Sequence, residues 1–292
     1  MVSTHELKVS HIFSVKDFVC VVTGGGTGIG LMCTQALAAN GARVYITGRR
    51  MEALETAAKA HSPSDEGQII PIGPCDVTKK EDLEKLVSDI SKREKHVNLL
   101  ITNAGVSGPK AEPESSKATE LKDTLWQNED FEQWNSTFNT NVSSVYFTTV
   151  AFLPLLQAGT ETYGPRTASV IVISSMSGIM RHAQGHFSYN AAKGATVHLA
   201  KLMSAEFEKT EIRVNSIAPG YFPSEMTAKE SGEDQKSHLP DEKVQEKGHT
   251  PAQRPGSDEE MAQAVIFLAR NTYVNGEIIA VDGGTLNKVP GR

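Results

Sequence analysis

The chain has 292 residues, of which 39% are hydrophobic and 22% are charged, an ordinary composition for a soluble globular protein with one large domain or two small ones. Its formal net charge of −6 argues against a nucleic-acid-binding surface. No apolar run approaches the length of a membrane span, and residues 1–17 lack the layout of a signal peptide. Cys20, Cys33 and Cys75 have no metal-ligand spacing, so we expect buried free thiols, no metal site and a reducing, cytoplasmic location.

The first predicted elements form a βαβ unit. Residues 18–23 are a short apolar run typical of a strand that is buried on both faces. This run leads into the glycine-rich segment 24–30 and then into a helical pattern, which ends at Asn40-Gly41, a typical C-terminal cap. A second strand is predicted at 42–47. Two parallel strands joined in this way should have a right-handed crossover.

The glycine-rich segment is typical of a dinucleotide site. Glycines between a buried strand and a helix allow close backbone approach, and the free N–H groups of the helix N-terminus can bind a pyrophosphate. The tip of the second strand carries Arg49 and Arg50 instead of an acid that would bind the ribose 2′-OH. Guanidinium groups suit a 2′-phosphate, so we predict NADP(H) in preference to NAD(H). Alternatively, the arginines are solvated, or one of them stacks on adenine.

Further elements alternate along the middle of the chain. Residues 69–73 are predicted to be a third strand, and their prolines indicate an edge position. Thr78 and Glu81 have the spacing of a capping box for the helix that follows. Asp76 either caps the turn or accepts a hydrogen bond from the adenine amino group. A fourth strand is predicted at 97–102.

Two polar segments interrupt this alternation. Residues 107–130 form an insertion with a short helix at about 120–126, and it is either a solvated excursion or a wall of the substrate entrance. Residues 221–254 are polar and charged and have the character of a lid that orders over a ligand. We expect both segments to belong to one domain at 17–292, preceded by an N-terminal extension at 1–16.

The second half of the chain contains the remaining helices. Residues 131–156 form a long helical pattern in which Pro154 predicts termination or a kink. Ser257 and Glu260 have the spacing of a capping box for the last helix. Two further strands flank that helix and complete the predicted sheet.

An apolar strand at 169–173 ends in a serine pair, and Tyr189 and Lys193 follow on a predicted helix. At spacing i, i+4 their side chains share one helix face. A lysine ammonium near a phenol lowers the phenol pKa from about 10, so the tyrosine could exchange a proton with a carbonyl oxygen near neutral pH. This spacing alone is a weak signal, because such pairs more often place the lysine in water. The strand end supports a site, since open α/β sheets place their chemistry there.

Together, these residues resemble the classical short-chain dehydrogenase/reductase family over about residues 16–285. Seven motifs occur in the order typical of the family: Thr23-Gly24-x-x-x-Gly28-x-Gly30, Asp76-Val77, Asn103-Ala104-Gly105, Asn141, Ser175, Tyr189-x-x-x-Lys193 and Pro219-Gly220. The resemblance implies a single α/β domain of the Rossmann type, with a doubly wound, seven-stranded parallel sheet in the order 3-2-1-4-5-6-7. It also implies a homodimer or homotetramer.

The resemblance implies roles for four catalytic residues. Tyr189 would be the general acid in ketone reduction and the base in alcohol oxidation. Lys193 would hold the nicotinamide ribose and lower the pKa of Tyr189, and Ser175 would donate a hydrogen bond to the substrate oxygen. Asn141 would support a water chain to Lys193, or else it is an ordinary helix asparagine that kinks the backbone.

The serine assignment leaves alternatives. Ser175 precedes Tyr189 by fourteen residues, one more than is usual in the family. We expect the loop at 179–187 to absorb the extra residue and prefer Ser175, because it opens a Ser-Met-Ser-Gly turn. Ser174 and Ser177 are the alternatives.

The resemblance also implies a set of cofactor contacts from the glycine-rich turn, the strand ends and the start of the lid-like segment. The implied residues are Gly24, Thr27, Gly28, Ile29, Gly30, Arg49, Arg50, Asp76, Val77, Asn103, Ala104, Gly105, Tyr189, Lys193, Pro219, Gly220, Phe222 and Ser224.

The sequence thus indicates an NADP(H)-dependent oxidoreductase that interconverts a ketone and a secondary alcohol. Its two polar segments resemble those of fungal ketone reductases that act on acyl-carrier-protein or secondary-metabolite substrates. The expected partner is a small carbonyl or alcohol substrate, with no nucleic acid and no membrane. The alternatives are a non-catalytic nucleotide sensor, a methyltransferase with a similar glycine-rich turn, and an epimerase or dehydratase of the same fold.

Overall fold

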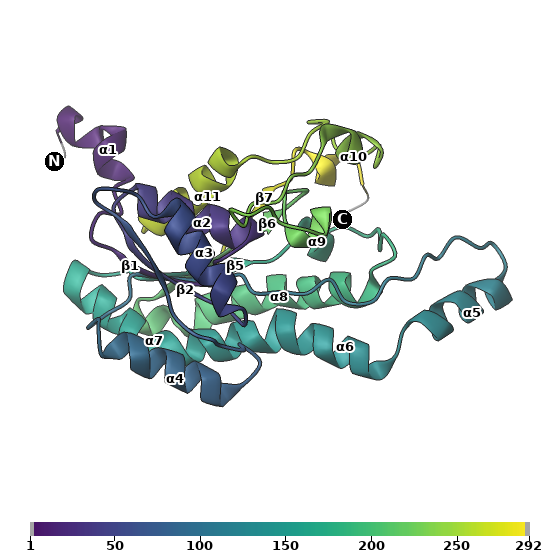
Figure 1. Cartoon of the computed structure of the whole chain (residues 1–292), viewed down its shortest axis with the longest axis horizontal. Coiled ribbons are helices and arrows are strands. Elements are labelled where there is room, and N and C mark those ends of the chain that lie inside the picture. Colours follow the sequence, from purple (N-terminus) through teal and green to yellow (C-terminus); the bar gives the residue numbers. More distant parts are fainter. Residues whose placement is uncertain (1–2, 290–292) are drawn as a thin grey trace.

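The computed structural model describes residues 3–289 and has three layers (Figure 1). The middle layer is a seven-stranded sheet in the order β3-β2-β1-β4-β5-β6-β7, in which every neighbouring pair is parallel. Its strands are β1 (Val19–Thr23), β2 (Arg43–Thr47), β3 (Gln68–Pro71), β4 (Leu99–Thr102), β5 (Ser169–Ile173), β6 (Arg213–Pro219) and β7 (Ile278–Val281). The predicted order is confirmed, as is the edge position of β3, which ends in Pro71.

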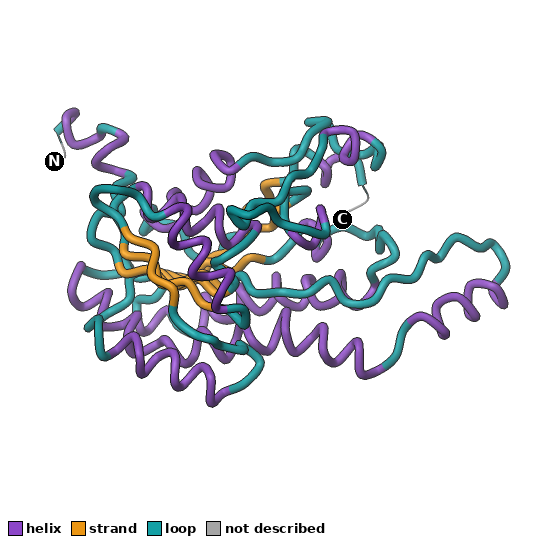
Figure 2. Tube along the Cα trace, viewed as in Figure 1, coloured by secondary structure: helices purple, strands orange, loops and turns teal. Residues whose placement is uncertain are grey.

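Helices cover both faces of the sheet, which appears in orange between purple layers in Figure 2. One face is covered by α2, α3 and α11, and the other by α4, α7 and α8 (Figure 1). The helices are α1 (Val9–Ile12), α2 (Gly28–Ala39), α3 (Met51–His61), α4 (Lys80–Ser91), α5 (Ala118–Asn128), α6 (Phe131–Phe138), α7 (Ser144–Tyr163), α8 (Phe187–Glu206), α9 (Glu225–Ala228), α10 (Asp241–Gln245) and α11 (Asp258–Arg270).

The covering of both faces explains the unbroken apolar strands. In β1, Cys20 and Val22 pack in the core on the α2 side, while Val19 and Val21 pack in the core on the α4 side. Because successive side chains of a strand point to opposite faces, a strand covered on both sides needs apolar residues at every position. All three cysteines are buried and free, as expected.

The helix before β4 begins differently from the prediction. α4 starts at Lys80, and its N-cap is Lys79, which makes no side-chain cap hydrogen bond. The Thr78 hydroxyl and backbone N–H instead donate to Asp76 Oδ1, at 2.7 and 3.0 Å. The predicted capping box of Thr78 and Glu81 is therefore wrong, because the Asp76 turn uses the threonine hydroxyl. The capping box at Ser257 and Glu260 is confirmed.

The long helical pattern continues past Pro154. α6 and α7 are joined by a π-helical turn at Asn139–Ser143, and α7 runs on to Tyr163 with Pro154 inside it. Termination at Pro154 was thus wrong. Pro154 is exposed, whereas the neighbouring Phe152, Leu155 and Leu156 are buried against the sheet, and their burial offsets the lost backbone hydrogen bond.

Counted as one helix, Phe131–Tyr163 has 33 residues and contains an 18-residue window with a mean hydropathy of 1.3, enough by length and composition to cross a membrane. The expectation that no apolar run reaches this length therefore needs correction. The helix packs against α4, β4 and β5, so it is a core helix that covers one face of the sheet.

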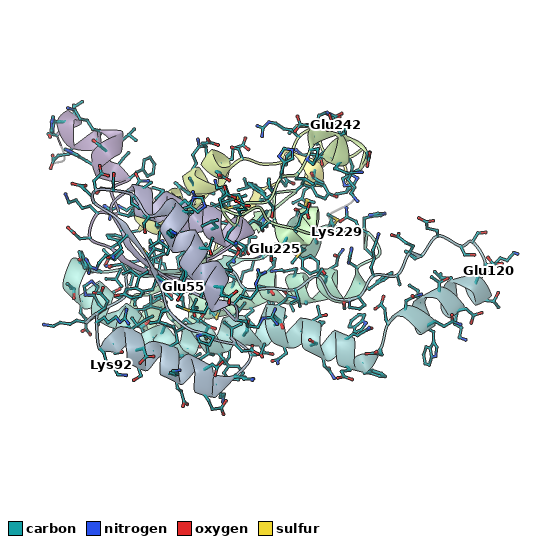
Figure 3. The ribbon with its side chains drawn as sticks, viewed as in Figure 1. Glu55, Lys92, Glu120, Glu225, Lys229 and Glu242 are labelled. Carbon is teal, nitrogen blue, oxygen red and sulfur yellow. The ribbon has the colours of Figure 1, made fainter. Side chains whose placement is uncertain are left out.

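The insertion at 107–130 forms an arm that extends away from the three layers (Figure 1). Its helix α5 is confirmed and is longer than predicted, and none of its residues is buried. Glu120, labelled in Figure 3, lies near the outer end of this arm. Of the two alternatives, the structure favours the solvated excursion for the helical part of the insertion.

We expect Arg213→Leu to lower the free energy of unfolding by about 3 kcal/mol, because a buried, charge-bearing donor is lost. Arg213 is 1% exposed and donates to four backbone carbonyls, among them those of Leu268 and Ala269 at the end of α11. Urea unfolding would measure the change. The exposed Arg93 makes no side-chain hydrogen bond within the described residues, so Arg93→Leu is the control and should change stability little. Equal effects of the two substitutions would contradict the prediction.

Candidate active site

A cleft of about 480 Å³ lies at the carboxyl ends of the strands, where the strand order reverses between β1 and β4. All the predicted site residues line it except Gly30 and Asn141. The lining residues that the sequence predicted are Gly24, Thr27, Gly28, Ile29, Arg49, Arg50, Asp76, Val77, Asn103, Ala104, Gly105, Ser175, Tyr189, Lys193, Pro219, Gly220, Phe222 and Ser224.

The glycine-rich turn has the geometry of a phosphate cradle. Gly24 and Gly28 have φ of +65° and +51°, and a Cβ on Gly28 would lie 2.8 Å from Ser224 Cβ. Gly30 faces the turn itself, since a Cβ there would overlap the Gly24 carbonyl oxygen. Thr27, the N-cap of α2, makes no side-chain cap bond, which leaves the first-turn N–H groups open to a ligand. The turn therefore fits a pyrophosphate.

Asn103 anchors this turn to the end of β4. Its Nδ2 donates to the carbonyl oxygens of Thr23 and Gly24, at 3.0 and 3.1 Å, and its backbone N–H donates to Thr23 Oγ1. The asparagine thus fixes the distance between β1 and β4 at the point where the cleft opens.

The two arginines at the tip of β2 have different surroundings. Arg50 forms an ion pair with Glu225 of α9, 2.7 Å between Nη2 and Oε2, and Figure 3 labels Glu225 near α3. Arg49 donates no hydrogen bond within the described residues and lies close to Asp76. The pKa of Asp76 is lowered mainly by the Thr78 hydroxyl and in part by the Arg49 charge. Arg49 is therefore the guanidinium better placed for a phosphate.

Tyr189 and Lys193 lie on α8, as predicted. Lys193 is 4% exposed, and its Nζ donates to the Ile173 carbonyl at the end of β5 at 2.9 Å. The same Nζ is 5.8 Å from the centre of the Tyr189 ring. Burial lowers the pKa of Lys193 to about 8, because it disfavours the charged form.

The pKa of Tyr189 differs from the sequence-based expectation. Burial raises it, and a hydrogen bond with the Ser175 hydroxyl offsets part of that rise. The predicted lowering by Lys193 is therefore wrong for this arrangement, because the lysine donates to the Ile173 carbonyl and burial of the phenol raises its pKa. Tyr189 consequently holds its proton at neutral pH, which suits a general acid.

Among the three candidate serines, Ser175 lies beside Tyr189. Its Oγ accepts a hydrogen bond from the Ser177 N–H at 3.1 Å, and the residue lines the cleft. Ser174 also lines the cleft, but its Oγ donates to the Ile217 carbonyl of β6. Ser177 does not line the cleft.

Asn141 is fully buried and lies outside the cleft lining. Its Nδ2 donates to the carbonyls of Val106 and Thr137, and its Oδ1 accepts from the Val106 N–H. The π-helical turn contains Asn141, so the structure shows the distorted helix that one alternative predicted. The side chain holds the chain just after β4 in place.

Several residues of the cleft wall were not predicted from the sequence. Ser136, Asn139 and Thr140 line the cleft from α6 and the π-helical turn. The spacing of these residues is helical, but a long helical pattern does not show which polar face turns toward a site. The ion pair between Arg50 and Glu225 joins residues far apart in the sequence, so no local sequence pattern predicts it.

A sequence model of the short chain dehydrogenase family matches residues 18–235, which include the glycine-rich turn, Ser175, Tyr189 and Lys193. The chain belongs to the classical short-chain dehydrogenase/reductase family. It is an enzyme of that family with a nicotinamide cofactor and small carbonyl or alcohol substrates.

Three relatives show how far the similarity extends. The short-chain dehydrogenase/reductase PhomF of Diaporthe leptostromiformis is 40% identical over 98% of this chain and 97% of its own length. The 3-oxoacyl-[acyl-carrier-protein] reductase FabG of Chlamydia trachomatis is 32% identical over 90% of this chain and 95% of its own length. The active-site complex of Pseudomonas aeruginosa RhlG with NADP has a TM-score of 0.78 at 30% identity, covering 94% of this chain and 98% of that chain.

We expect kcat/KM for the nicotinamide cofactor to fall as the pH rises through about 8, because Lys193 loses its charge there. Lys193→Arg keeps a positive charge to much higher pH, so its profile should lack this fall even if its overall rate is lower. Steady-state rates between pH 6 and 10 would measure both profiles. An identical alkaline fall in the two enzymes would assign it to another group.

Proposed function

We propose that the protein is an NADP(H)-dependent oxidoreductase that interconverts a ketone and a secondary alcohol. The observation that carries this proposal is the convergence of the Tyr189 phenol, the Ser175 hydroxyl and the Lys193 ammonium at one cleft with a phosphate cradle. A nucleotide sensor or a methyltransferase would have no use for these three groups together.

The residues of the cleft fit a dinucleotide with a 2′-phosphate. The open N-terminus of α2 would bind the pyrophosphate, Arg49 would bind the 2′-phosphate, and Lys193 would hold the nicotinamide ribose. When bound, the cofactor supplies the hydride. The structural similarity to RhlG, whose structure contains NADP, supports this choice of cofactor.

The protein's own groups manage the proton. In ketone reduction, the Tyr189 hydroxyl gives its proton to the carbonyl oxygen as that oxygen gains negative charge, and the Ser175 hydroxyl donates a second hydrogen bond to it. The resulting tyrosinate is stabilised by the nearby Lys193 ammonium. In alcohol oxidation the same groups take the opposite roles, and Tyr189 accepts the proton of the alcohol as the base.

Several finer points belong to this proposal. The remaining predicted cofactor residues would also contact the cofactor: Asp76, Val77, Asn103, Ala104 and Gly105 at the adenosine end, and Pro219, Gly220, Phe222 and Ser224 at the nicotinamide end. Asn141 would act through a water chain to Lys193. The similarity to FabG, a 3-oxoacyl-[acyl-carrier-protein] reductase, supports a ketone of the 3-oxoacyl type as substrate. A homodimer or homotetramer in the cytoplasm is the form in which we expect the enzyme to work.

Arg49→Ala should weaken NADPH binding about 10- to 100-fold, since one charge-assisted contact with a phosphate is lost. NADH lacks that phosphate, so its affinity should change little. Fluorescence titration of the purified protein with each cofactor measures both. Arg93→Ala, at an exposed site away from the cleft, is the control. A parent protein that prefers NADH would refute the role of Arg49, and one that binds neither cofactor would refute the function.

Tyr189→Phe should lower kcat for ketone reduction by about 10²–10⁴-fold while NADPH still binds, because only the transferable proton is removed. The measurement is NADPH oxidation in the presence of a panel of ketones. Net oxidation by the parent protein would also exclude the epimerase and dehydratase alternatives, which return the cofactor to its starting state. A Tyr189→Phe enzyme with the kcat of the parent would refute the role of Tyr189 as the general acid.

A further inference from the structure

Side chains from three separate segments meet beside the cleft. Gln184 lies in the loop between β5 and α8, Tyr221 follows β6, and His249 lies near the far end of the lid-like segment. Gln184 Nε2 is 2.7 Å from Tyr221 Oη, which is 3.0 Å from His249 Nε2. None of the three lines the cofactor cleft.

One hydroxyl contacts both of its neighbours. An amide nitrogen only donates, so Tyr221 Oη accepts from Gln184 Nε2. The same Oη forms a hydrogen bond with His249 Nε2, in which the imidazole tautomer determines the donor. Burial raises the pKa of Tyr221, so the phenol keeps its proton over the neutral range. Tyr221 therefore bridges the other two residues through one hydroxyl.

The backbone around Gln184 shows what this contact holds. Gln184 has φ of +53° and Gly185 has φ of +75°, and the left-handed region is unfavourable for a residue such as glutamine. The Gly185 carbonyl accepts a hydrogen bond from the Ala111 N–H of the insertion at 2.8 Å. The loop that carries the extra residue before Tyr189 is thus fixed from two sides, five residues before the catalytic tyrosine.

The other partners lie at the two ends of the lid-like segment. Tyr221 directly follows Gly220, which lines the cleft. The Tyr221 carbonyl accepts a hydrogen bond from the Gly256 N–H at 2.8 Å. Next to His249, Thr250 Oγ1 is 3.0 Å from Thr285 Oγ1. Both ends of the segment are therefore attached to the body of the protein where Tyr221 and His249 meet.

We propose that Gln184, Tyr221 and His249 form a staple that positions the loop before Tyr189 against the base of the lid-like segment, and so shapes the ketone side of the active site. They are positioning residues, and their effect on turnover rests on the proposed function. Loss of the staple frees two of the loops that surround the substrate and leaves the cofactor cradle intact. Ketone binding should then weaken while cofactor binding stays the same.

Tyr221→Phe removes the hydroxyl and keeps the ring, so it tests the staple with little change in packing. We expect amide hydrogen exchange to increase about tenfold in both 179–187 and 248–252, and to stay unchanged in β4. Tyr273→Phe is the matched control, because Tyr273 is 96% exposed. Faster exchange near residue 221 alone, or no change at all, would overturn the staple. This readout needs no substrate, so it decides the staple even if no ketone is turned over.

Kinetics test the positioning role. With a ketone found by the panel, Tyr221→Phe should raise the ketone KM about tenfold, with kcat and NADPH affinity within twofold of the parent. Gln184→Asn tolerates the left-handed backbone and shortens the amide, so it should have a similar effect. The double variant should be no worse than Tyr221→Phe alone, because Tyr221→Phe already removes the contact that Gln184→Asn weakens. Additive effects, or a parallel loss of NADPH affinity, would overturn the proposal.

Discussion

The parallel direction of all seven strands is the constraint on which the active site depends. Because every strand ends at the same edge of the sheet, residues as far apart as Gly24, Asn103, Ser175 and Pro219 lie around one cleft. The reversal of strand order between β1 and β4 opens the cleft at that edge. Asn103, just after β4, joins the ends of these two strands, because its side chain donates to the carbonyls of Thr23 in β1 and of Gly24 in the turn that follows.

Burial is the second influence on the chemistry. It acts in opposite directions on two side chains of the cleft, because it disfavours whichever form is charged: it raises the pKa of Tyr189 and lowers that of Lys193. At neutral pH the tyrosine is a phenol with a proton to donate, and the lysine is an ammonium within a unit or so of its pKa. The hydrogen bond with the Ser175 hydroxyl lowers the pKa of Tyr189 and so offsets part of the rise caused by burial. The cleft therefore holds the proton that the proposed reduction of a carbonyl requires.

The loops around the cleft are held together by contacts between residues distant in sequence. Arg50 and Glu225 join the tip of β2 to α9, and Gln184, Tyr221 and His249 join the loop before Tyr189 to the lid-like segment. The sheet and its cofactor cradle are held by the backbone ladder and the buried core. Substrate selection in this enzyme should accordingly depend on the loops, while cofactor binding depends on the sheet edge.

The sequence by itself determined the sheet, its strand order through the family resemblance, and most of the cleft. Apolar strands and glycine spacing are local signals, and the motifs from Thr23 to Pro219 occur in family order. Only the tertiary structure decided the pKa direction of Tyr189, the use of Thr78 by Asp76, and the partners of Arg50 and Tyr221. These depend on burial and on contacts between distant residues, because solvent exclusion and hydrogen-bond geometry arise only when separate elements pack together.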